Sequence, residues 1–373
     1  MSEHPGWTAP GSPGGQLPQE PPAPAPAAPP QQGGWGQAPH PGGGSWAARA
    51  PRPGIIPLRP LSLGELWDGA FRAVRTNPGP LLGSAAVVVV ITTTISSLVQ
   101  VFSLSGFESS LTALEDDPTA SPDQVLSSLG AGLPGLLGGS LLSAVLTLVA
   151  VAALTGVVTT SVSTAVLGRR TPGRELWARV RGRLGPLVGV SLLASLIPSL
   201  AAALLFVPGA AVVVGGAVNG SDGALLGGGA LLLLGALAAL VVGLFLTVRL
   251  FMAPAVLVLE GQGVGASLKR AWALSKRGFW RLLGIYLLTA VCIGVVAAVV
   301  ATPFSFAGSA VGFAVGVDSP MYLPVTLVLS GIGTVLASTV LYPLQAAVVA
   351  LQYVDQRMRL EGLDVDLARA AAR

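Results

Sequence analysis

The sequence has little charge, almost no cysteine and few histidines. Only 10% of its 373 residues are charged, whereas an average soluble domain is about 25% charged. The single cysteine, Cys292, cannot form an intrachain disulfide. Both histidines, His4 and His40, lie near the N-terminus. The rest of the chain therefore lacks the side chain used most often for acid–base catalysis and metal binding.

Common catalytic and metal-binding patterns are also missing. The sequence contains no G-x-S-x-G, G-x-x-x-x-G-K-[ST] or H-E-x-x-H pattern and no paired-cysteine metal spacing. We therefore expect a protein that is not an enzyme and that uses no cofactor and no metal.

Apolar residues dominate instead, at 52% of the chain, and the mean hydropathy is +0.72. A helix that crosses a bilayer needs about 20 predominantly apolar residues. Six runs satisfy this length, namely Leu81–Leu104, Leu136–Leu167, Leu184–Val218, Leu225–Leu259, Leu282–Ala301 and Leu323–Val354. Some are longer than a bilayer is thick, and we expect kinks at Pro198, Pro208, Pro254, Pro303 and Pro343. The sequence thus predicts an all-α integral membrane protein with six transmembrane helices.

Proline and glycine are concentrated at the N-terminus. The first 54 residues contain 14 of the 30 prolines and 11 of the 49 glycines. Such a segment buries too little apolar surface to offset the entropy lost on ordering. We therefore expect residues 1–57 to form a disordered cytoplasmic tail, residues 58–367 a six-span membrane domain, and residues 368–373 a cytoplasmic end.

Positive charge is absent from every second loop. The loops after the first, third and fifth runs contain no Lys or Arg, and all 21 such residues lie on the other side or at its boundary. The acidic residues of the basic-free loops are Glu108, Glu115, Asp116, Asp117, Asp123, Asp222 and Asp318. Because cytoplasmic loops carry the excess of Lys and Arg, we expect both termini in the cytoplasm and the chain in the inner (cytoplasmic) membrane.

Three basic, tryptophan-containing segments resemble one another: Glu65–Gly83, Glu175–Gly189 and Ala266–Gly284. Each leads directly into an odd-numbered apolar run. A helix with Lys or Arg on one face and Trp or Leu on the other is typical of the membrane interface. The pattern predicts three repeats of an interfacial amphipathic helix plus a transmembrane hairpin. Such repeats are common in transporters, although any hairpin that enters from a basic membrane face has a similar pattern.

Local signals mark where the first two interfacial helices begin. Ser62 and Glu65 have the spacing of a capping box, and Thr171 followed by Pro172 predicts a second helix start. The apolar stripe of the first helix is expected to comprise Leu63, Leu66, Trp67, Ala70, Phe71 and Val74.

The third repeat carries the densest basic cluster. Lys269, Arg270, Lys276 and Arg277 alternate with aromatic residues there. Their position beside a span favours anionic lipid head groups as partners, at about 1 kcal/mol per basic residue near the surface. We expect no nucleic acid partner.

Two further charges lie in or next to the fourth apolar run. Arg249 falls within the run, near its expected cytoplasmic end, where a long side chain can snorkel to the interface or pair with another helix. A specific contact with a lipid phosphate or substrate is the alternative. Glu260 ends the run, and we expect it to pair with Lys269, Arg270 or an arginine near the C-terminus.

Charges crowd together again in "YVDQRMRLEGLDVDL", after the last apolar run. Asp355 with Arg359, and Arg357 with Glu361, have the i,i+4 spacing of helical ion pairs, each worth a few tenths of a kcal/mol when exposed. Gly362 is suited to a helix end. This stretch is expected to be a helix that leaves the membrane and docks onto Arg249, Glu260 or the interfacial helices.

Three quoted segments resemble the membrane domain of bacterial glycerophosphodiester phosphodiesterases. They are "RPLSLGELWDGAFRAVRTNP", "RLFMAPAVLVLEGQGVGASLKRAWALSKRGFWRLLG" and "YVDQRMRLEGLDVDL", and the resemblance extends over Leu58 to Leu367. The composition is also similar to that of actinobacterial membrane proteins. Enzymes of that family carry a soluble barrel with catalytic histidines, for which this sequence has neither the length nor the histidines. The resemblance therefore implies the membrane module alone.

These observations predict a non-catalytic multi-pass membrane protein. It would act as a lipid-associated scaffold or as the membrane partner of another protein. The alternative is a transporter of lipid-like or small amphipathic molecules. The first prediction is favoured because the spans lack buried charge and a clear discontinuous helix.

Overall fold

The computed structural model describes residues 54–115, 122–317, 319–363 and 369. The predicted disordered tail falls almost entirely outside these residues. Within them the chain forms ten α-helices and no strand, which confirms the all-α prediction. The helices are α1 (Leu63–Thr76), α2 (Pro78–Glu115), α3 (Pro122–Val166), α4 (Gly173–Arg181), α5 (Leu184–Val218), α6 (Asp222–Leu250), α7 (Ala253–Glu260), α8 (Val264–Lys276), α9 (Phe279–Val315) and α10 (Tyr322–Glu361).

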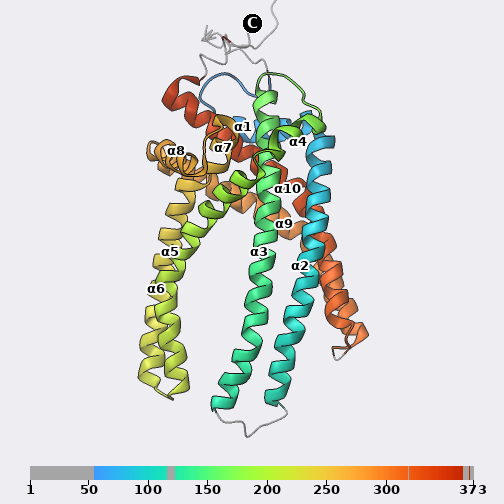
Figure 1. The fold of residues 1–373 in the computed structure, drawn as a ribbon, viewed down its shortest axis with the longest axis vertical. Helices are drawn as coiled ribbons and strands as arrows, with labels where there is room; N and C mark the ends of the chain where they lie inside the picture. The colour runs from blue at the N-terminus through green and yellow to red at the C-terminus, as the bar shows by residue number, and fades with distance from the viewer. Residues whose placement is uncertain (1–53, 116–121, 318, 364–368, 370–373) are drawn as a thin grey trace, which may run out of the picture. The chain divides into compact units, whose positions relative to one another are not determined.

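Six helical stretches are long and apolar enough to cross a membrane. They correspond to α2, α3, α5, α6 with α7, α9 and α10, and they confirm the six predicted spans. Successive long helices pack as three hairpins, α2 with α3, α5 with α6, and α9 with α10 (Figure 1).

Glycines let the helices of each hairpin approach closely. A Cβ added at Gly209 of α5 would lie 2.5 Å from the Leu232 Cα of α6. In the third hairpin, a Cβ at Gly308 would lie 2.9 Å from the Thr326 carbonyl oxygen. Small residues at such positions bring backbones together where lipid supplies no hydrophobic driving force.

A short helix precedes each hairpin, as the three repeats predict. The helix pairs α1–α2, α4–α5 and α8–α9 are each separated by only one or two residues. The predicted capping box is present in α1, where the Glu65 N–H donates to Ser62 Oγ and the Ser62 N–H to Glu65 Oε2. Pro172 is the N-cap of α4. The three-repeat architecture is therefore confirmed.

The buried face of α1 differs from the predicted stripe. Leu66 and Ala70 are buried together with Gly69 and Ala73, whereas Leu63 and Phe71 are each 46% exposed. A Cβ at Gly69 would lie 2.7 Å from Ile56 and 3.1 Å from Leu351. Close packing therefore selects the small residues of α1, and two of its large apolar side chains lie on the surface.

The fourth span is broken, contrary to the prediction of no clear discontinuous helix. Helix α6 ends at Leu250, and α7 begins at Ala253 with Pro254 in its first turn. Proline lacks an N–H and its ring clashes with the carbonyl four residues earlier, which favours a break between α6 and α7 at this point. The other four prolines expected to kink the spans lie inside helices that continue past them: Pro198, Pro208, Pro303 and Pro343.

The buried core lies at the end of the hairpins where α1, α4, α7 and α8 gather (Figure 1). It joins these helices to the C-terminal halves of α3 and α10. Ile55 and Ile56 belong to it, and the Ile55 N–H donates to the Ala165 carbonyl oxygen. Much of the remaining surface of the long helices is apolar and exposed, as suits contact with lipid.

Candidate functional site

Asp355 clamps the segment before α1 onto α9 and α10. Its carboxylate is fully buried and accepts from the Leu61 N–H at 2.7 Å. Arg281 of α9 and Arg359 of α10 both pair with this carboxylate, and both donate to the Leu61 carbonyl oxygen at 2.8 Å. The Asp355–Arg359 pair has the predicted i,i+4 spacing, and the segment before α1 packs over the Asp355 carboxylate.

A second cluster is a closed ring of polar contacts. Glu260, at the end of α7, accepts from Arg270 at 3.1 Å and from the Tyr353 hydroxyl at 2.6 Å. Arg270 also pairs with Glu361, which pairs with Arg357 at 2.8 Å. Arg357 in turn donates to the Tyr353 hydroxyl at 3.4 Å. The ring ties the ends of α7 and α10 to α8.

The ring fixes the charge of Arg270. Burial alone would lower the pKa of this guanidinium, but hydrogen bonds and attraction from Glu260 and Glu361 outweigh that effect and raise it. Arg270 therefore stays protonated and serves as a tie between two carboxylates.

The other basic residues predicted on and after α8 lie apart from both clusters. Lys269, Lys276 and Arg277 are exposed. No ion pair links them to any acidic residue in the part of the chain that the structure describes. They remain predicted contacts for lipid head groups.

Arg249 is not part of the carboxylate clusters and lies inside an aromatic cage. Its guanidinium carbon is 4.9 Å from the Phe245 ring centroid, 5.3 Å from that of Trp272 and 5.1 Å from that of Phe279. Phe245 comes from α6, Trp272 from α8, and Phe279 from α9. The closing stretch of α10 therefore docks onto Glu260 and the segment before α1, and its ion pairs do not include Arg249.

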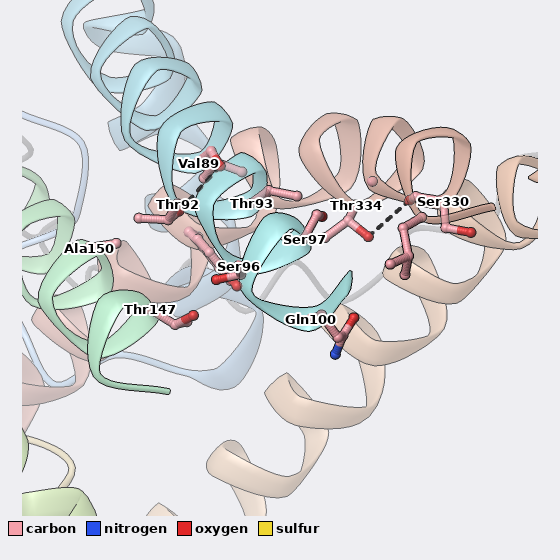
Figure 2. Close-up of a pocket in the computed structure, with 13 residues that line it drawn as sticks. Val89, Thr92, Thr93, Ser96, Ser97, Gln100, Thr147, Ala150, Ser330 and Thr334 are labelled. Atoms are coloured by element: carbon pink, nitrogen blue, oxygen red, sulfur yellow. Dashed lines mark hydrogen bonds between the residues drawn. The ribbon is translucent and has the colours of Figure 1, made fainter. Parts of the chain in front are cut away.

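A cavity of about 260 Å³ lies between α2, α3 and α10 (Figure 2). Hydroxyl-bearing residues from all three helices line it. Thr92, Thr147 and Thr334 each donate to the carbonyl four residues earlier, at 2.8, 2.9 and 3.1 Å. Ser96 Oγ is buried without a partner among the described residues. The hydroxyls of Thr92, Thr147 and Thr334 thus satisfy their own helix backbone.

A larger cavity of about 430 Å³ lies where all three hairpins meet. Its walls come from α3, α5, α6 with α7, α9 and α10, and Phe251 and Pro254 place it at the break in the fourth span. The lining is mainly apolar, with hydroxyls and the amide of Gln345. Tyr342 lines both cavities.

The family model described as a domain of unknown function, DUF7847, matches residues 67–356. The chain belongs to this family. Comparison with curated proteins and with solved structures finds no match. None of these comparisons names a phosphodiesterase membrane domain.

The DUF7847 match spans the three repeats, the aromatic cage and both cavities. It begins within α1 and ends at Gln356 of α10. Asp355 and Tyr353 therefore lie inside the DUF7847 region, whereas Arg357, Arg359 and Glu361 follow it. Within residues 54–115, 122–317 and 319–363, no group of three or more His, Cys, Asp or Glu side chains could hold a metal ion.

Sequence reasoning missed the polar groups of the larger cavity. Tyr286, Tyr342 and Gln345 are polar residues inside otherwise apolar spans, and this was the available signal. The prolines were a second signal, because Pro198 and Pro254 line the cavity. The cage around Arg249 had no comparable signal, since its aromatic residues come from three different helices.

Proposed function

We propose that this DUF7847 protein is a non-catalytic, lipid-associated protein of the inner (cytoplasmic) membrane, with both termini in the cytoplasm. In this proposal it holds an uncharged, lipid-like molecule in the larger cavity. The observation that carries the proposal is the position of that cavity, which all three hairpins line.

The chemistry of the lining supports an uncharged amphipathic ligand. No Asp, Glu, Lys or Arg lines the cavity. Ser195 and Ser199 donate to backbone carbonyls of α5, and the other polar residues of the lining are Thr155, Ser191, Thr247, Tyr286, Tyr342 and Gln345. A volume of about 430 Å³ falls in the range of roughly 300–1,000 Å³ that is usual for ligand sites.

A non-catalytic role fits the state of the charged residues. The carboxylates of Asp355, Glu260 and Glu361 are engaged by arginines that hold helices together. The resemblance to the phosphodiesterase membrane domain supports a role beside another protein, such as a separately encoded hydrolase. The partner protein should co-purify with the full chain after mild solubilisation. If it does not co-purify with a variant that lacks residues 1–53, the tail is the segment that binds the partner.

Transport is the second candidate, and the break between α6 and α7 favours it. Discontinuous helices border the substrate sites of many transporters, and here Phe251 and Pro254 line the larger cavity. Movement of a fluorescent monoacylglycerol across vesicles that contain the purified chain would support transport. Retention in the cavity without movement would support the scaffold role.

Cavity filling tests the proposed site. Ala194 lines the cavity from α5, whereas Ala203 of the same helix is exposed and does not line it. We expect a photoreactive monoacylglycerol to label α3 and α5 next to the cavity, and Ala194→Phe to remove most of this labelling. Ala203→Phe is the matched control and should keep it. Equal labelling of both variants would rule out the cavity as the site.

A further inference from the structure

Arg249 carries a positive charge that no carboxylate of the described residues balances. By contrast, Arg270, Arg281, Arg357 and Arg359 each pair with Asp or Glu. Arg249 Nε and Nη1 are buried and have no hydrogen-bond partner in the described part of the chain.

Aromatic faces offset only part of the cost of this arrangement. Rings of Phe245, Trp272 and Phe279 lie within 5.3 Å of the guanidinium carbon and attract its charge through their quadrupoles. They accept no hydrogen bond in the plane of the guanidinium, where its N–H groups point. The cage therefore lacks an acceptor in the plane of the guanidinium. The buried N–H groups that stay unpaired destabilise the folded state.

We propose that the phosphate group of an anionic phospholipid completes this site. A phosphate accepts forked hydrogen bonds from a guanidinium and balances its charge. Arg249 is only partly buried, so the site has an open side. Nη2 shares one forked edge with Nη1 and another with Nε, and an oxyanion that reaches Nη2 can therefore extend to either unpaired donor.

The surroundings of the cage suit a lipid. Lys276 lies one helical turn after Trp272, on the same face of α8, and adds a second cation beside the cage. Trp280 is 81% exposed next to Phe279, as is typical of a residue at the level of the head groups. Val241, one turn before Phe245 on α6, is 67% exposed and offers an apolar path for an acyl chain. The cage is separate from the larger cavity, so this inference does not depend on the proposed function.

The test measures thermal unfolding of the purified full chain in a neutral maltoside detergent. The additions are phosphatidylglycerol, diacylglycerol without phosphate, and inorganic phosphate. The variants are Arg249→Met and, as a control that loses an exposed arginine outside the cage, Arg169→Gln. We expect phosphatidylglycerol to raise the melting temperature of the wild type and of Arg169→Gln by about 3 °C or more, and that of Arg249→Met by much less.

The detergent-only samples separate a ligand site from a structural one. Without phospholipid, Arg249→Met should be at least as stable as the wild type, because it removes an unbalanced buried charge. If the melting temperature of Arg249→Met is below that of the wild type by the same amount with and without phosphatidylglycerol, the aromatic rings alone stabilise Arg249. The proposal is then wrong. A shift with inorganic phosphate alone supports the site and assigns it to free phosphate. A shift of equal size with diacylglycerol contradicts phosphate recognition.

Arg249→Lys covers the case in which Arg249→Met does not fold. Lysine keeps the charge within the cage but lacks the planar fork. A smaller shift with phosphatidylglycerol than in the wild type supports the proposal, and an undiminished shift contradicts it.

Discussion

At the scale of single residues, burial decides which charged contacts stabilise the protein. The Asp355 side chain is fully buried between Arg281 and Arg359, and neutralising its carboxylate leaves both arginines without an anionic partner among the described residues. We expect Asp355→Asn to lower the free energy of unfolding by about 3–5 kcal/mol. Denaturation of the purified chain in detergent, followed by circular dichroism, measures this loss.

The exposed pair Glu175–Arg179 of α4 provides the control for Asp355. Its side chains are 50% and 53% exposed, and such pairs contribute about 0–1 kcal/mol. Glu175→Gln should therefore change the unfolding free energy little. Similar losses for Asp355→Asn and Glu175→Gln would show that the clamp on Leu61 does not stabilise the fold.

The sequence predicted the short-range contacts of these residues and not the long-range ones. Spacing alone predicts the Arg357–Glu361 and Asp355–Arg359 pairs, which are present. The contact from Asp355 to the Leu61 N–H joins residues 294 positions apart, and local patterns carry no information over that distance. Arg270 and Lys269 were both candidates for Glu260, and only the orientation of α8 selects Arg270.

At the scale of helices, close approach makes some glycines essential and leaves others replaceable. Gly308 of α9 faces α10, where an added Cβ would lie 2.9 Å from the Thr326 carbonyl oxygen. That oxygen belongs to the backbone and cannot rotate away. We expect Gly308→Ala to destabilise the protein by about 1–3 kcal/mol through overpacking, as measured by thermal unfolding in detergent.

Gly294 of the same helix is the matched control, because nothing lies within 4 Å of a Cβ added there. Alanine has a higher helix propensity than glycine, so Gly294→Ala should be neutral or stabilising by up to about 1 kcal/mol. Opposite effects of the two substitutions are expected. Equal effects would mean that the α9–α10 contact does not depend on the glycine.

Helix boundaries were predictable only in part. The third apolar run, Leu184–Val218, coincides with α5, whose N-cap and C-cap are the polar residues Arg183 and Asn219. Among the five prolines expected to act as kinks, Pro254 alone begins a new helix. The short helix α7 packs against α3, α5, α8 and α10. These tertiary contacts stabilise the break, and a single sequence cannot show them.

At the scale of the whole protein, the charge distribution predicts sidedness and the repeats predict the hairpins. Neither indicates where the hairpins meet. The larger cavity and the aromatic cage both depend on contacts between different repeats, α3 with α5 and α6 with α8 and α9. The sequence therefore predicts the membrane class, the number of spans and individual residues such as Arg249 and Glu260, but not the contacts between repeats that assemble the candidate sites.

Orientation in the membrane remains a prediction of the charge pattern, and two glycines can test it. Gly223 lies at the start of α6 and Gly265 at the start of α8, and a Cβ at either position meets nothing within 4 Å. Helix α6, residues Asp222–Leu250, is about 44 Å long at 1.5 Å per residue. That length exceeds a hydrocarbon core of about 30 Å, so the two glycines should lie on opposite sides.

The experiment uses a Cys292→Ser background, since Cys292 is the only cysteine of the chain. In intact cells, we expect a membrane-impermeant maleimide to label Gly223→Cys and to leave Gly265→Cys unlabelled. After the cells are opened, both variants should react, which shows that each cysteine is accessible. Labelling of Gly265→Cys but not Gly223→Cys in intact cells would show that the chain has the opposite orientation in the membrane. The basic residues around α8 would then face away from the cytoplasm, against the bias of Lys and Arg towards cytoplasmic loops.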